Sequence, residues 1–224
     1  HKEYRRQRQM CIRDRSAAMP TYVGTTFIET RLVDGDRRHP ASAGLIGSGT
    51  LMAVEPGKGI LGHRYANGIL QAYVALSQPQ AWFSAIDFTC RPSALARIAQ
   101  EFDGWAPALR ALVTEGDVDL IVRPLHALPV AHQWDRLPGA TLVGDAAHLM
   151  SPFAGEGANL ALYDGAELAH ALCAHPSDIE AGLAAYEQAL FPRSASAATL
   201  TARNHECFFG PHAPASVAQL FAAH

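Results

Sequence analysis

The feature that most constrains the fold is a short apolar run, followed by a glycine-rich loop and an alanine-rich helix, within Thr141–Leu172. The run ends abruptly at Gly144-Asp145, the loop contains Gly155-Glu156-Gly157, and the helix is expected to begin near Ala158 or Asn159. A strand of this kind delivers a carboxylate to a ligand, and a helix N-terminus delivers backbone N–H groups to the same ligand. The stretch therefore predicts a strand–carboxylate–helix ligand site.

Each half of this site also has a plain structural interpretation. The Asp145 carboxylate suits a hydroxyl-rich partner such as a ribose or ribityl chain, or it is a turn residue that caps the next segment. Glycines leave N–H groups accessible to a flat ligand, and a helix N-terminus favours a ring that develops negative charge, such as a reduced flavin. Alternatively, the loop is an ordinary connection to a core helix.

Upstream of this stretch, short strand-like segments joined by tight turns predict an antiparallel sheet. The expected strands are Tyr22–Val33, Leu51–Val54, Gly59–Arg64, Ile69–Ser77 and Trp82–Thr89. Asn67-Gly68 is the strongest hairpin signal in the chain. The glycines of Gly44–Gly49 (GLIGSG) do not match the dinucleotide fingerprint, which needs GxGxxG between a strand and a helix, so we interpret them as a turn at the sheet edge.

The spacing of apolar residues then predicts two helices and two strands, over Ser93–Phe102, Ala108–Val113, Asp117–Leu125 and Ala140–Val143. Ser93 is the expected N-cap of the first helix. Beyond the central stretch, Ser177–Glu180 (SDIE) is a capping-box signature that predicts a long helix. We expect Pro192 to kink this helix and small residues to carry it on to about Asn204.

Composition and charge narrow the class of function. The net charge of −3 argues against nucleic acid or an anionic membrane as the main partner, and no apolar run reaches the roughly 18 residues that span a bilayer. The four cysteines are scattered without a CxxC pair, and no histidines have metal-ligand spacing. We therefore expect no metal site, no disulfide framework and a cytoplasmic location. The basic residues 1–15 lack the apolar stretch of a secretory signal, and a nucleic-acid-binding arm is an alternative to a disordered or foreign tail.

The central stretch contains GDAAH at 144–148, SPFAGEGAN at 151–159 and then Asp164. This combination closely resembles the second flavin-binding motif of the FAD-dependent aromatic hydroxylases. Further segments are similar to the tetracycline-inactivating branch of that family, namely Tyr22-Val23-Gly24-Thr25, Leu51-Met52-Ala53, Phe102 with Trp105, and Arg123-Pro124-Leu125. From about Tyr22 to Asn204 the chain looks like the later half of such an enzyme.

The resemblance implies an α+β portion of an α/β flavoprotein, in which an antiparallel substrate-domain sheet precedes the C-terminal strand and helices of the FAD-binding domain. It divides the chain into a basic tail (1–19), a substrate-binding sheet domain (20–126), the C-terminal part of the FAD-binding domain (127–206) and an irregular tail with a last short helix (207–224). The strand–GxGxxG–helix unit that grips the ADP half of FAD is not recognised. We therefore expect this chain alone to bind FAD weakly or not at all, and to be inactive.

The activity implied for the intact protein is a monooxygenase that uses FAD, NADPH or NADH, and O2 to hydroxylate an aromatic or polyketide-like small molecule through a flavin hydroperoxide. Because the cofactor carries the hard chemistry, the protein needs little acid–base help, and we assign no catalytic residue. One alternative is another flavin oxidoreductase of the same fold, such as a halogenase or a reductase. A second is a non-catalytic ligand-binding remnant.

The resemblance also implies the cofactor-binding residues, which are Gly144, Asp145, Pro152, Gly155, Glu156, Gly157, Ala158 and Asn159. Asp145 would hold the ribityl chain, residues 155–159 would lie at the pyrimidine edge of the isoalloxazine, and Pro152 and Phe153 would lie near the ring face. Glu156 stands where many relatives have Gln. We interpret His148 as a structural residue that anchors the turn after Asp145, with polarisation of a group near the flavin as the alternative.

Overall fold

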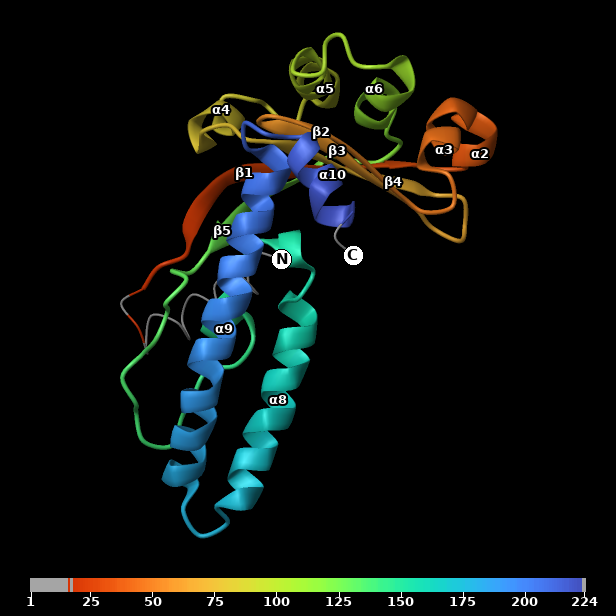
Figure 1. The fold of residues 1–224 in the computed structure, drawn as a ribbon. Coiled ribbons are helices and arrows are strands. Elements are labelled where there is room, and N and C mark those ends of the chain that lie inside the picture. The colour runs from red at the N-terminus through yellow and green to blue at the C-terminus, as the bar shows by residue number, and fades with distance from the viewer. Residues whose placement is uncertain (1–15, 17, 223–224) are drawn as a thin grey trace. The chain divides into compact units, whose positions relative to one another are not determined.

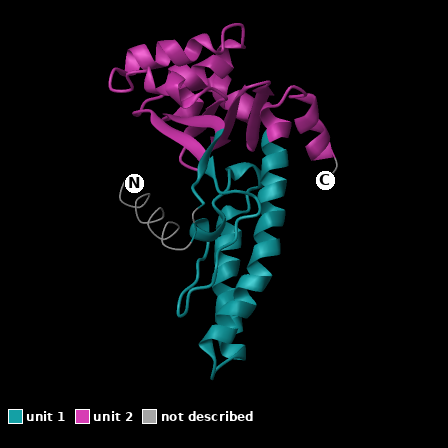
Figure 2. Cartoon of the chain, turned by 90° about the vertical axis from the view of Figure 1, so that its left-hand side faces the viewer, with its two compact units in different colours: residues 1–23, 126–205 teal, residues 24–125, 206–224 magenta. Residues whose placement is uncertain are grey.

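The computed structural model describes Ser16 and residues 18–222 of the 224-residue chain, so the predicted basic tail lies almost entirely outside the described residues. The chain forms two compact units (Figure 2). We call residues 24–125 together with 206–222 the sheet unit, and residues 18–23 together with 126–205 the helical unit. Among the helices of the described residues, none is both long and apolar enough to cross a membrane.

The sheet has five strands in the order β2-β3-β4-β1-β5 (Figure 1). They are β1 (Thr21–Leu32), β2 (Thr50–Glu55), β3 (Lys58–Arg64), β4 (Leu70–Leu76) and β5 (Ile121–Ala127). The pairs β2–β3, β3–β4 and β1–β4 are antiparallel, as predicted. The hairpin signal is also confirmed, because Gly68 lies in the turn between β3 and β4 with a φ of +73°.

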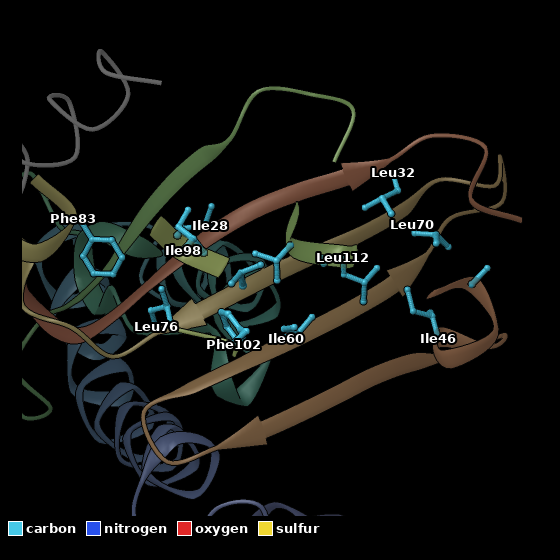
Figure 3. Packing of buried hydrophobic residues seen from close by; sticks show 14 residues of the cluster. Ile28, Leu32, Ile46, Ile60, Leu70, Leu76, Phe83, Ile98, Phe102 and Leu112 are labelled. Carbon is cyan, nitrogen blue, oxygen red and sulfur yellow. The ribbon is translucent and has the colours of Figure 1, made fainter. Parts of the chain in front are cut away.

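Helices cover one face of this sheet (Figure 1). They are α2 (Gly35–Arg38), α3 (Pro40–Ile46), α4 (Gln80–Ser84), α5 (Arg91–Gln100) and α6 (Pro107–Thr114). Alternate residues of the strands, among them Ile28, Ile60 and Leu70, form one apolar cluster with Phe102, in the turn after α5, and Leu112 of α6 (Figure 3). This cluster is the core of the sheet unit. The opposite faces of β1 and β4 carry polar residues such as Glu29, Arg31 and Gln71, which follows from the two-residue period of a strand.

The strand predicted over Trp82–Thr89 is wrong, because Gln80–Ser84 form helix α4. Aromatic and β-branched residues favour a strand locally, but Phe83 is buried in the core cluster and Trp82 packs against it, and this tertiary packing decides the conformation. The Gly44–Gly49 segment also differs in part from the prediction. Gly44 lies inside α3, and only the last three residues form the turn that leads into the edge strand β2.

Two predicted boundaries in the sheet unit are corrected. Helix α5 begins at Arg91 with Cys90 at the N-cap position, so Ser93 is not the cap; Pro92 in the first turn fits this earlier start. Strand β5 begins at Ile121 rather than Asp117. The Asp117 carboxylate instead accepts a hydrogen bond from the Val33 N–H at 2.7 Å, which holds that residue in the connection before β5.

The helical unit contains α7 (Asp145–His148), the 3₁₀ turn η1 (Pro152–Ala154), α8 (Gly157–Ala174) and most of α9 (Ile179–Phe209). Helices α8 and α9 lie side by side (Figure 1), and a Cβ at Gly182 of α9 would approach the Ala171 carbonyl of α8 within 3.1 Å. Trp134, Leu142 and Tyr186 belong to the buried apolar cluster of this unit.

The predictions for the long helix need three corrections. Asp178 caps α9, because its Oδ1 accepts a hydrogen bond from the Ala181 N–H at 3.0 Å, whereas Glu180 accepts one from the Gly139 N–H at 2.6 Å and closes no capping box. The helix continues through Pro192 to Phe209, well past the predicted end. The start of the predicted tail is not irregular, because it holds the end of α9, whereas the last short helix predicted there is formed by α10 (Ala215–Ala222).

The strand predicted over Ala140–Val143 is not formed. Only an isolated bridge joins Ala140 to Leu137, and within the described part of the chain residues 141–143 belong to no strand ladder. A strand is stabilised by hydrogen bonds to a neighbouring strand, so an apolar run without such a neighbour does not qualify.

Candidate functional site

A sharp turn at Gly144 connects the apolar residues 141–143 to α7. Gly144 has a φ of +57° and a ψ of −138°, a combination that residues with a Cβ rarely adopt. A Cβ at this position would also lie 3.1 Å from the Cβ of Ala161 on α8. Glycine is therefore required both for the backbone conformation and for the close approach of the turn to α8. Asp145, the next residue, is the first of α7 and is half-buried.

Asp164 of α8 is the residue that fixes this turn. It is fully buried, and its Oδ2 accepts hydrogen bonds from the Gly144 N–H at 2.9 Å and from His148 Nε2 at 2.7 Å. Its Oδ1 accepts a third from Arg193 Nη2 of α9 at 3.0 Å. The carboxylate therefore joins the turn, α7, α8 and α9. Sequence reasoning placed Asp164 in the motif without a role, because its partners lie 16 to 29 residues away.

The electrostatics of Asp164 favour its charged form. Burial by itself would raise the pKa of this carboxyl, but the hydrogen bonds from His148, the Gly144 N–H and Arg193 outweigh burial and lower the pKa. Because a carboxylate only accepts, His148 must carry its proton on Nε2. His148 is itself buried, so the structure gives it the scaffolding role that we favoured, although its partner is Asp164.

The loop after α7 is held by the far part of α9. Thr201 is buried, and its Oγ1 donates to the Ser151 carbonyl at 2.7 Å and accepts from the Ala154 N–H at 3.1 Å. Asn204 Nδ2 donates to the Phe153 carbonyl at 3.0 Å. These bonds fix the main chain of η1. Neither α9 residue was predicted to contribute to the site, and no local spacing signals such a contact.

The middle of α9 holds the segment before the turn. The buried Glu187 carboxylate accepts hydrogen bonds from Trp134 Nε1 at 3.2 Å and from Thr141 Oγ1 at 2.7 Å. Tyr186 donates its phenolic O–H to the Leu142 carbonyl at 3.2 Å, and burial raises the pKa of this phenol. The Glu187 and Tyr186 contacts replace the missing strand ladder as the support of residues 141–142.

These elements surround a cavity of about 640 Å³. Its lining residues are Val143, Gly144, Asp145, Ala146, Met150, Ser151, Pro152, Gly155, Gly157, Ala158 and Ala161. Six of the eight predicted cofactor-binding residues therefore meet at one cavity. Glu156 and Asn159 are not among its lining residues, and neither is Phe153, whose ring lies 4.9 Å from that of His205.

The N-terminus of α8 is open towards a ligand. Glu156 occupies the N-cap position but makes no side-chain hydrogen bond to the helix, and the first turn contains no acidic residue. The first N–H groups of a helix have no partner within the helix, and its N-terminus carries about half a positive charge. Gly155, with a φ of +69°, and Gly157 leave the approach to these groups free of side chains. The cavity thus joins hydrogen-bond donors, positive potential and one nearby carboxylate, a combination that suits a polar cofactor with both hydroxyl and anionic groups.

Comparison with known proteins identifies a related family. Residues 127–201 match the family model described as "FAD binding domain". The monooxygenase penA of Penicillium thymicola is 26% identical over 234 residues, which cover 84% of this chain and 54% of the relative. The chain thus spans about half the length of the curated relatives that match it over most of its length.

Solved structures share the fold. A structure of Klebsiella pneumoniae HpxO complexed with FAD and uric acid superimposes with a TM-score of 0.72 at 20% identity, and the match covers 92% of this chain and 49% of HpxO. The tetracycline destructase Tet(51) gives a TM-score of 0.62 at 16% identity and covers 92% and 52%, respectively. The predicted fold class is confirmed.

Proposed function

We propose that this chain, a relative of the FAD-dependent aromatic hydroxylase-type monooxygenases, supplies the flavin-holding loop and helix of such an enzyme. The activity proposed for the intact protein is oxygenation of an aromatic or polyketide-like small molecule with FAD, O2 and NADPH or NADH. The named relatives and the family model support this choice over a halogenase or reductase.

One observation carries the proposal: the Gly144-Asp145 turn and the uncapped N-terminus of α8 line the same cavity. The cavity lining suits a flavin, because Gly155 and Gly157 place no side chain beside the N-terminus of α8. A side chain at these positions would occupy space that the flat ring system needs. The cavity of about 640 Å³ lies within the range of ordinary cofactor sites.

Each residue then has a defined task. Asp145 would accept hydrogen bonds from hydroxyl groups of the ribityl chain, and the first N–H groups of α8 would donate to the pyrimidine edge. Pro152 would help to exclude water from the bound ring. When bound, FAD reduced by the nicotinamide supplies the oxygen-transfer chemistry. The helix N-terminus favours negative charge on the ring by about 0.3–1 kcal/mol, rising to ~2 kcal/mol when partly buried.

The test compares flavins that differ in size. The purified chain is titrated with FAD and with FMN, and binding is followed by quenching of flavin fluorescence. We expect weak binding of similar strength for both, because the contacts proposed here involve only the ring and the ribityl chain. Asp145→Ala should weaken both by at least about tenfold, the effect of losing hydrogen bonds to a charged group.

Asp135→Ala is the matched control, since Asp135 is exposed, lies in the helical unit and does not line the cavity. Equal flavin binding by the Asp145→Ala variant and the unsubstituted chain would refute the assignment of the site. The chain alone is proposed to be inactive; oxygen uptake with NADPH above the free-flavin background would overturn that part of the proposal.

A further inference from the structure

A charged cluster lies on the face of the sheet opposite the helical layer. Along β1, Ile28 and Leu32 point into the apolar core (Figure 3). Glu29 and Arg31 alternate with them and therefore point the other way. Thr30 confirms the orientation of the core face, because its Oγ1 donates to the Leu112 carbonyl of α6 at 2.6 Å.

Glu29 is held there between two arginines. Only 2% of its side chain is exposed. Its Oε1 accepts from Arg31 Nε at 3.0 Å and Nη2 at 2.6 Å, and its Oε2 accepts from Arg123 Nε at 3.1 Å and Nη2 at 2.9 Å. The two guanidinium side chains are 45% and 39% exposed. The buried carboxylate thus holds two half-exposed guanidinium groups in fixed orientations.

Each guanidinium retains unused donors. A guanidinium has five N–H donors, and Glu29 takes one from Nε and one from Nη2 of each arginine. Across the part of the chain that the structure describes, Nη1 of neither Arg31 nor Arg123 has a hydrogen-bond acceptor in the protein. The free edge is the one with which arginine binds carboxylates and phosphates through two parallel bonds. The cluster also carries a net charge of +1.

Two aromatic residues, Tyr73 and Phe27, lie beside the cluster. Tyr73 of β4 lies directly opposite Glu29 in the strand register, and its ring centroid is 5.5 Å from that of Phe27 with an interplanar angle of 34°. Gln71, the register partner of Arg31, donates its Nε2 to the Tyr73 hydroxyl at 2.7 Å. The rings and the guanidinium groups therefore occupy neighbouring positions on one face of three adjacent strands, β4, β1 and β5.

Stability alone does not account for this arrangement. One arginine would already neutralise Glu29, and the second adds an uncompensated positive charge beside the first. Buried ion pairs are also a weak source of stability, because removing the charges from water offsets much of their attraction. Two preoriented guanidinium edges beside an aromatic surface are, by contrast, what a planar anion requires.

We propose that Arg31 and Arg123, oriented by Glu29, form an anion-binding subsite that recognises a carboxylate or an ionised hydroxyl on a planar aromatic substrate, with Tyr73 and Phe27 contacting the ring. This names the substrate class of the proposed monooxygenase as acidic aromatic compounds. The role in catalysis rests on the proposed function, whereas binding of the anion by the sheet does not.

The experiment uses the full chain without flavin, so that its outcome is independent of FAD binding. Benzoate and benzamide, which have nearly the same shape and differ in charge, are titrated into isotopically labelled protein, and NMR follows the Tyr73 and Phe27 ring signals. Benzoate should shift these signals and bind at least about tenfold more tightly than benzamide, and added salt should weaken its binding. Equal binding of the two probes, or no shift of either ring, would overturn the proposal.

Two variants assign the effect to the arginines. Arg31→Gln and Arg123→Gln should each weaken benzoate binding by at least about tenfold and leave benzamide binding unchanged. Arg97→Gln is the control, because Arg97 lies on α5 and pairs with Glu101. Benzoate binding that survives both substitutions refutes the subsite. Since the benzoate–benzamide comparison is made on the unsubstituted chain, misfolding of a variant does not remove the test.

Discussion

Replacing Asp164 by Asn tests whether one carboxylate organises the turn at Gly144, which belongs to the proposed flavin site. The substitution preserves shape but removes the charge that His148 and Arg193 contact at 2.7 and 3.0 Å in a fully buried position. Breaking a buried ion pair by removing one partner costs about 3–5 kcal/mol. Because Asn retains an oxygen that still accepts from the Gly144 N–H, we expect a loss at the lower end, about 3 kcal/mol.

The shifted pKa of Asp164 predicts how the stability loss of Asp164→Asn depends on pH. The pKa of Asp164 is lowered in the folded chain, so its contribution to stability is present above the unfolded pKa of about 3.9 and is lost as the pH falls through the lower folded pKa. The difference in the free energy of unfolding between the unsubstituted chain and Asp164→Asn should therefore be full at neutral pH and shrink below about pH 4.

The assay is urea denaturation at several pH values, followed by the fluorescence of the buried Trp134. Asp135→Asn is the control, because Asp135 is exposed and a surface change of this kind alters stability by no more than about 0.5 kcal/mol. If Asp164→Asn changes the free energy of unfolding by no more than that margin, or if the difference persists unchanged in acid, the network does not hold the turn.

Two further substitutions probe the same site. Gly144→Ala should destabilise the chain by about 1–3 kcal/mol and abolish FMN binding, because Gly144 has a φ of +57°. Gly165→Ala is the control, since Gly165 has open space around it on α8, and it should stabilise the chain by about 0.5–1 kcal/mol. Thermal melts and FMN titration compare the two variants, and equal melting temperatures would contradict the geometry. Thr201→Val should cost about 1–3 kcal/mol by leaving the Ser151 carbonyl and the Ala154 N–H unpaired, and amide hydrogen exchange in that loop should rise. Thr199→Val, which removes only an exposed hydroxyl bonded within α9, should leave exchange unchanged, and a similar rise in both variants would contradict the assigned role.

Much of the sheet follows from local signals. Four of the five strand predictions before the helical layer match observed strands, because β-branched residues and an Asn-Gly turn agree with the final packing. The failure at Trp82 and Phe83 has the opposite cause. Their side chains favour a strand by themselves, but contacts with residues distant in sequence place them on a helix.

The candidate site also contains some residues that the sequence predicts and others that it does not. The residues that line the cavity lie within Val143–Ala161, a single short stretch of the sequence, so a motif can report them. The supports come from Arg193, Thr201 and Asn204, which α9 brings to the loop from tens of residues downstream. No periodicity in the sequence predicts those bonds, because they depend on how two helices pack.

The arginine pair shows a third kind of information, which only the strand register provides. Glu29 and Arg31 are two positions apart on β1, so the sequence alone places them on one face of a strand. Arg123 joins them because β5 lies beside β1 in the sheet, across 94 residues of chain. A motif that identifies a flavin-binding loop therefore carries no information about the substrate. In the proposed subsite, the charge of the substrate is recognised on the sheet, where residues far apart in sequence become neighbours.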